Sequence, residues 1–113
     1  MIKYFINIPL FIWFSFSCAH LFDQNWYMGN THAHTKICGH ADSSPEIVTK
    51  WYHDHGYNFL ILSEHNHFID PDTVPLPADK RDDFILIPGE EITGSNKIHT
   101  TAMNIEHIVP WDY

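Results

Sequence analysis

Residues 58–63 read Asn58-Phe59-Leu60-Ile61-Leu62-Ser63 (NFLILS), a short apolar run that follows Gly56. A run of this length without polar alternation is typical of a strand that is buried on both faces, as in a parallel sheet. Residues 84–87 (FILI), closed by Pro88 and Gly89, form a second run of the same kind. The two runs predict strands inside one sheet.

Residues 26–35 (WYMGNTHAHT) predict a strand that runs into a loop. A helix is expected between this loop and the NFLILS strand. Ser44 suits the capping position, Pro45 the first helical position, and the charge of Glu46 the helix dipole. Gly56 is the expected stop. The apolar side chains expected on one face of this helix are those of Ile47, Val48, Trp51 and Tyr52.

The remaining segments complete an α/β order of elements. Residues 68–83 are polar and rich in proline, which predicts a long loop with at most a short helix. Residues 99–105 (HTTAMNI) predict a further strand. Strand, helix, strand, loop, strand and strand indicate an α/β architecture, and so few strands cannot close a barrel by themselves.

Composition restricts the classes of partner. The chain has 113 residues with 6 basic and 14 acidic side chains, a net charge of −8, and 10 histidines. Without a basic stripe, binding to a nucleic acid backbone is not expected. Histidine is the commonest metal ligand, and the spacing of the histidines indicates which of them could bind one ion together.

The first residues predict a secretory signal peptide, residues 1–19. A positive start that contains Lys3 precedes a mostly apolar stretch, and Ser17 and Ala19 are small residues placed for cleavage after Ala19. We therefore expect residues 20–113 to form the mature domain, either periplasmic or extracellular. An uncleaved membrane anchor is the alternative, because the uncharged stretch approaches the roughly 20 residues that span a bilayer. Lipidation at Cys18 is a weaker reading, since Ser15 replaces the usual aliphatic residue.

Cleavage would leave a single cysteine, Cys38. It is expected to be a buried or loop residue, with a soft metal ligand as the less favoured reading because imidazole and carboxylate groups dominate nearby.

Two histidines at the end of the first predicted strand are the first candidate ligands. His32 and His34 are two residues apart, which on a strand places both side chains on one side. His53 and His55 have the same spacing, but on the predicted helix they point in different directions and should not chelate. We expect that second pair to lie at a solvated helix end.

Further candidate ligands stand where the apolar runs end. NFLILS is followed by Glu64, His65, Asn66 and His67, and FILIPG is followed by Glu90 and Glu91. In parallel α/β sheets, sites lie at the carboxyl ends of the strands. Only one of the two neighbouring glutamates can face a given site, and His67 is expected at a polar rim. His40 lies in the loop before the helix, and His99 opens the last strand.

The motifs and their order along the chain resemble the PHP (polymerase and histidinol phosphatase) family. The resemblance is strongest to exported members of that family. The resemblance covers residues 26–105, and it rests on five segments: GNTHAH from Gly29, GHADSSPE from Gly39, WY…HGY from Trp51, LSEHN from Leu62, and PGEEIT from Pro88 with the His99 segment.

The resemblance implies the N-terminal part of a distorted (β/α)7 TIM-like barrel that binds two or three divalent metal ions (zinc, manganese or iron). By motif position the implied metal ligands are His32, His34, His40, His65, Glu91 and His99. Glu91 would bridge the ions, and Glu91 and His65 are the expected catalytic residues. Glu64 departs from the family, which usually has aspartate there. The family's later ligands, another histidine and a closing Asp-x-His, have no counterpart after His99, and His107 matches none of them, so an incomplete domain is expected.

The implied function is metal-dependent hydrolysis of a small-molecule phosphoester by a metal-activated water. The sequence offers no serine or cysteine nucleophile with a paired base, which favours water as the attacking group. Three alternatives stay open: an exported PHP-type hydrolase of carboxylic or carbamate esters, an amidohydrolase, whose barrel also opens with H-x-H, and a truncated, inactive metal-binding fragment.

Overall fold

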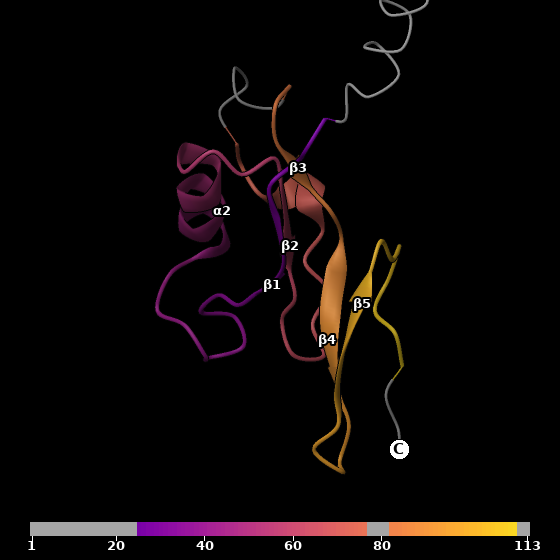
Figure 1. Ribbon diagram of the computed structural model, residues 1–113. Helices are drawn as coiled ribbons and strands as arrows, with labels where there is room; N and C mark the ends of the chain where they lie inside the picture. Colours follow the sequence, from indigo (N-terminus) through magenta and orange to yellow (C-terminus); the bar gives the residue numbers. More distant parts are fainter. Residues whose placement is uncertain (1–24, 77–81, 111–113) are drawn as a thin grey trace, which may run out of the picture.

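The computed structural model describes residues 25–76 and 82–110 (Figure 1). The predicted signal peptide lies outside these residues. Among the helices that are described, none has the length and apolar character that a membrane span requires. The elements, in chain order, are β1 (Gly29–Ala33), α2 (Pro45–Asp54), β2 (Phe59–Leu62), the 3-10 helix η2 (Pro71–Thr73), β3 (Ile85–Leu86), β4 (Gly89–Thr93) and β5 (His99–Met103).

A three-stranded parallel sheet has the order β1-β2-β3, so β2 is its central strand. Leu60 and Ile61 in this strand are almost completely buried, as expected for a strand that is covered on both faces. The register between β1 and β2 shifts between Asn30 and Ala33. This irregularity occurs at the position of His32, the first candidate ligand.

Helix α2 connects β1 to β2 and begins with Pro45 directly after Ser44, as predicted, but the Ser44 side chain makes no capping hydrogen bond. Its predicted apolar face was partly wrong. Val48 and Tyr52 do pack against the core, but Ile47 and Trp51 are exposed. The inward face instead includes the buried Pro45 and Thr49, which complete the helical i, i+3, i+4, i+7 pattern.

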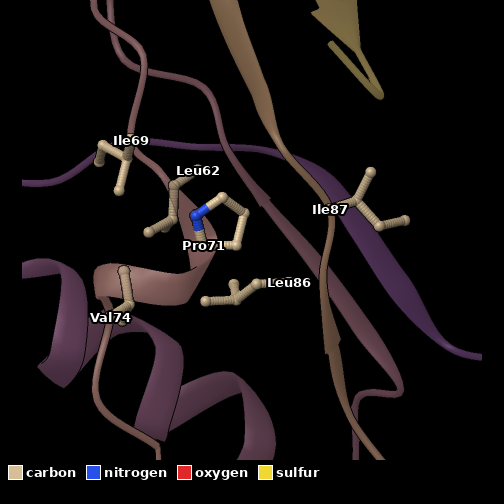
Figure 2. Close-up of a pocket in the computed structure, with 6 residues that line it drawn as sticks. All are labelled: Leu62, Ile69, Pro71, Val74, Leu86 and Ile87. Atoms are coloured by element: carbon tan, nitrogen blue, oxygen red, sulfur yellow. The ribbon is translucent and has the colours of Figure 1, made fainter. Parts of the chain in front are cut away.

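The hydrophobic core lies where the parallel sheet packs against α2 and against the segment that follows β2. Ile69 and Val74 from that segment are buried with Leu62, and Pro71 and Leu86 lie beside them (Figure 2). The side chains leave a cavity of about 10 Å³, no larger than one water. The predicted long loop therefore covers the sheet and contains η2, and its residues 77–81 lie outside the described part.

Strands β4 and β5 form an antiparallel hairpin in which Glu91 pairs with Thr101 and Thr93 with His99. The sequence predicts β5 but not β4, because Pro88 and Gly89 indicate the end of a strand before Glu90 and Glu91. In Figure 1, α2 lies to the left of β1 and β2, and the hairpin lies to the right. Backbone hydrogen bonds from the Glu91 N–H to the Glu64 carbonyl and from the Asn66 N–H to the Glu91 carbonyl, both 2.9 Å, join it to the segment after β2.

Candidate metal centre

The carboxyl ends of β1 and β2 and the adjacent hairpin bring five predicted ligands together. His32 lies in β1, His34 follows it, and His65 follows β2. Glu91 lies in β4 and forms a parallel bridge with His65. His99 is the first residue of β5. Four separate segments therefore contribute to one site.

The Glu91 carboxylate lies at the centre of four imidazoles. Its Oε2 atom is 3.1 Å from Nε2 of His34, 3.4 Å from Nδ1 of His65 and 3.6 Å from Nε2 of His32. Its Oε1 atom accepts a hydrogen bond from Nδ1 of His99 at 2.7 Å. The two carboxylate oxygens thus face different sets of imidazoles.

The imidazoles also lie close to one another. The Nε2 atoms of His32 and His34 are 3.2 Å apart, and the rings of His34 and His65 stack with centroids 4.8 Å apart. The ring of His40 lies 4.5 Å from that of His65 and 5.9 Å from that of His34. His40 is therefore beside the cluster, although it belongs to neither group of potential ligand atoms around Glu91.

Those two groups could each hold a metal ion. One consists of His32, His34 and Glu91, and the other of His65, Glu91 and His99, with all ligand atoms in a group within 4.8 Å of one another. Glu91 belongs to both. Imidazole nitrogens and carboxylate oxygens suit divalent ions such as zinc. His32 and His99 are about half exposed, which leaves the cluster accessible from solvent.

The Glu91 carboxyl is held in its ionised form. Burial raises the pKa of this carboxyl, but the hydrogen bond from His99 and the positive charges of His65, His32 and His34 outweigh burial and bring the pKa below its usual value. Burial also lowers the pKa of His34, and repulsion from His32 and His65 lowers it further, against the attraction of Glu91 and Glu64. A neutral imidazole beside a carboxylate is the protonation state that metal binding requires.

Oxygen Oε2 of Glu91 is buried and makes no hydrogen bond. The nearest imidazole nitrogens are close enough to coordinate the same ion as this oxygen, but none of them forms a hydrogen bond with it. A buried polar atom without a partner costs about 1–3 kcal/mol, and an absent ion or water commonly explains it. The donor set and this oxygen therefore fit a cation between the imidazoles and the carboxylate.

Three hydroxyl groups that the sequence did not predict at the site contact the histidines. Nδ1 of His32 lies 3.2 Å from both Ser63 Oγ and Thr101 Oγ1. Nδ1 of His65 lies 2.5 Å from Thr93 Oγ1. The available signal was period-2 alternation, since Thr93 and Thr101 share a hairpin face with Glu91. It was missed because β4 was not predicted.

Glu64 organises the loop between His34 and His40. It is fully buried, and its Oε2 atom is 4.0 Å from Nδ1 of His34. Its oxygens accept hydrogen bonds from the backbone N–H groups of Thr35 at 2.7 Å and Cys38 at 3.2 Å. Glu64 therefore contacts the loop backbone and the outer side of the His34 ring.

Cys38 lies next to this carboxylate, with its Sγ atom 3.5 Å from Nδ1 of His34. His34, Cys38 and Glu64 form a third group of potential ligand atoms. Burial and the neighbouring Glu64 raise the pKa of the Cys38 thiol, which disfavours the thiolate that binds metals. The two groups around Glu91 are chemically the better metal sites.

Within residues 25–76 and 82–110, the other candidate histidines and acids lie apart from the cluster. His55 stacks on Trp51, while His53 contacts Asp83 and Phe84. The pair does point in different directions, but its predicted solvation was wrong for His53, whose side chain is only 11% exposed. The remaining candidates are also outside the cluster: Glu90, which accepts a hydrogen bond from the Val109 N–H, and the exposed His67 and His107.

No protein-family model, curated protein or solved structure matches this chain.

Proposed function

We propose that this chain is part of an exported PHP-type metal-dependent hydrolase that cleaves phosphoesters, and that its domain is the N-terminal part of a TIM-like barrel. The resemblance of the five sequence segments supports the family and the reaction. The site geometry supports the metal-binding part of the proposal independently of that resemblance. Export rests on the signal-like residues 1–19 alone.

One observation carries the proposal: the buried Oε2 atom of Glu91 has no hydrogen bond but faces nitrogens of three imidazoles, those of His34, His65 and His32, at 3.1–3.6 Å. A purely structural cluster would satisfy this oxygen with a donor. A cation in the same place gives this oxygen and the Nε2 lone pairs of His32 and His34 a common partner.

The carboxylate of Glu91 suits a bridge between two cations. His32 and His34 would hold one ion together with this carboxylate, and His65 and His99 would hold a second. His40 lies close enough to His34 and His65 to act at the edge of the centre. Two divalent cations supply a water that is acidic near neutral pH and positive charge for the oxygens of a bound phosphoryl group.

The protein groups prepare the site for an anionic substrate. The low pKa of Glu91 keeps a negative ligand available, and the low pKa of His34 keeps its imidazole neutral. Bound cations reverse the local potential, so the acidic composition does not prevent phosphate binding. The half-exposed rings of His32 and His99 form the accessible side, where the substrate would approach.

A substrate panel tests the reaction. The full chain is assayed with Zn²⁺ or Mn²⁺ against p-nitrophenyl phosphate, bis(p-nitrophenyl) phosphate and p-nitrophenyl acetate. We expect metal-dependent release of p-nitrophenol from a phosphoester, and Glu91→Gln should reduce the rate by at least about 100-fold. His55→Ala is the matched control, because His55 contacts Trp51 and not the cluster.

Three outcomes of the panel are informative. Cleavage of the acetate alone would replace the phosphoesterase with the alternative ester hydrolase. Bound metal without any turnover would favour an inactive metal-binding fragment. Turnover that persists without metal, or in Glu91→Gln, would overturn the proposed mechanism.

A further inference from the structure

Asn66 has an unusual backbone conformation directly after His65. Its φ angle is 49°, in the left-handed region that a residue other than glycine adopts only at a cost. Asn66 makes three hydrogen bonds to β4, and these hold the conformation in place. Its N–H donates to the Glu91 carbonyl at 2.9 Å, its Oδ1 accepts from the Thr93 N–H at 2.8 Å, and its Nδ2 donates to the Thr93 carbonyl at 2.9 Å.

The side chain of Asn66 takes the place of a paired strand beside Thr93. In an antiparallel pair, two opposite residues exchange an N–H donor and a carbonyl acceptor. Here the Asn66 carboxamide makes the same two kinds of hydrogen bond with the backbone of Thr93. The chain turns away from β4 at Asn66, so the side chain continues the pairing that the backbone leaves. The segment with His65 is thereby fixed against the strand with Glu91.

Thr93 then determines the orientation of the His65 ring. The hydroxyl of Thr93 donates to the backbone carbonyl of Glu91 at 3.5 Å. The nitrogen that faces this hydroxyl at 2.5 Å, Nδ1 of His65, also lies 3.4 Å from Oε2 of the Glu91 carboxylate, an oxygen that can only accept, and this favours the tautomer with the proton on Nδ1. This places the free lone pair of His65 on Nε2, and the hydrogen-bond partner of one ring nitrogen commonly fixes the ligand nitrogen in this way.

We propose that Asn66 and Thr93 are positioning residues of the metal centre, and that together they fix His65 against Glu91 and select Nε2 of His65 as its ligand atom. The proposal deepens the proposed function and rests on it for the metal. The tautomer of His65 is a separate consequence that requires no metal.

The tautomer is measured first, by long-range ¹H–¹⁵N correlation spectra of the metal-free full chain near pH 8. We expect the Nδ1-protonated form of His65 in the wild type and in Thr93→Ser, which keeps the hydroxyl. Thr93→Val should shift His65 toward the Nε2-protonated form, whereas Thr100→Val, on the other hairpin face, should not. An Nε2-protonated His65 in the wild type would overturn the proposal.

Metal binding is measured next, by titration with Co²⁺ followed through its visible absorption. Asn66→Gly should weaken binding by about 10–100-fold and change the band shape, because residues that orient ligands have effects of this size. Glycine adopts a φ of 49° freely, so this variant removes the carboxamide without adding strain. Asn104→Gly is the matched control, since the exposed Asn104 also has a positive φ, 56°.

The outcomes separate this inference from the proposed function. A wild-type chain that binds no Co²⁺ would overturn the proposed function, and the tautomer would then decide the positioning role alone. A wild-type chain that binds Co²⁺ with the same affinity and spectrum as Asn66→Gly and Thr93→Val would overturn the positioning role and leave the function standing.

Discussion

Oxygen Oε1 of Glu64 accepts a hydrogen bond from the backbone N–H of Thr35 at 2.7 Å, and both residues are fully buried. This bond joins the segment after β2 to the loop that follows His34. A buried carboxylate is stable only where donors surround it. Glu64 thus links two of the segments that carry candidate ligands.

Replacing Glu64 should destabilise the protein. Glu64→Gln places an NH₂ group opposite one backbone N–H donor, and Glu64→Asp is too short to reach both Thr35 and Cys38. Loss of a hydrogen bond to a charged group costs about 1.5–3 kcal/mol, so the free energy of unfolding should fall by about 2 kcal/mol in urea denaturation. Glu106→Gln, at an exposed position, should change it little. Equal stability of all three variants would contradict the buried role of Glu64.

The two His-x-His pairs make a controlled comparison for metal binding. His34→Ala should weaken Zn²⁺ binding by at least about 100-fold, because it removes a ligand and not merely a residue that orients one. His55→Ala should leave the affinity within about twofold. Fluorescence competition with a zinc chelator measures both. An equal loss in both variants would show that histidine content, and not geometry, determines binding.

Acid should weaken the metal-free fold in two steps. The pKa of His34 in the folded chain lies below 6.5, so its contribution to stability is complete above pH 6.5 and is lost as pH falls toward the folded pKa. The pKa of Glu91 lies below 4.5, so its contribution is lost in a lower range. Urea midpoints near pH 7.5, 5.5 and 4 measure the profile. His34→Asn should flatten the upper step, and an unchanged upper step would contradict this assignment.

Gly89 should tolerate no side chain. A Cβ atom there would lie 2.5 Å from Cγ2 of Ile61 and 2.7 Å from the backbone oxygen of Ala102. The second contact is with the paired strand and cannot be relieved by a side-chain rotation. Gly89→Ala should therefore lower the free energy of unfolding by about 1–3 kcal/mol, measured in urea. Thr100→Ala, exposed on the same hairpin, should stay within about 0.5 kcal/mol.

The sequence predicted the elements of the parallel part of the fold because each has a local signal, but the burial predicted for residues 84–87 was wrong for Ile85, which is exposed in the edge strand β3. The apolar run around Leu60 and the Ser44-Pro45 helix start are examples of such signals. Strand β4 was missed because Pro88 and Gly89 usually end a strand, whereas here Gly89 begins one. Glycine is required at that position because the hairpin packs closely against Ile61, a contact distant in sequence.

The site was predictable in part for the same reason. Strand ends in a parallel sheet converge, so the positions of His34 and His65 followed from the order of the elements. Period-2 alternation indicates only that Thr93 and Thr101 share a hairpin face with Glu91, and nothing local indicates that Thr93 contacts His65 or that Ser63 and Thr101 contact His32. Those contacts depend on how the β4–β5 hairpin packs against the segment after β2, and residues distant in sequence determine that packing.

Isothermal titration of the full chain with Zn²⁺ at pH 7.5, for the wild type and for Glu91→Gln, tests most directly whether a cation binds between Glu91 and the imidazoles. The wild type should bind at least one Zn²⁺ saturably, and Glu91→Gln should weaken that binding by at least about 10-fold because it removes the shared carboxylate. A wild type that takes up no Zn²⁺, or a Glu91→Gln variant that binds it equally well, would contradict the account.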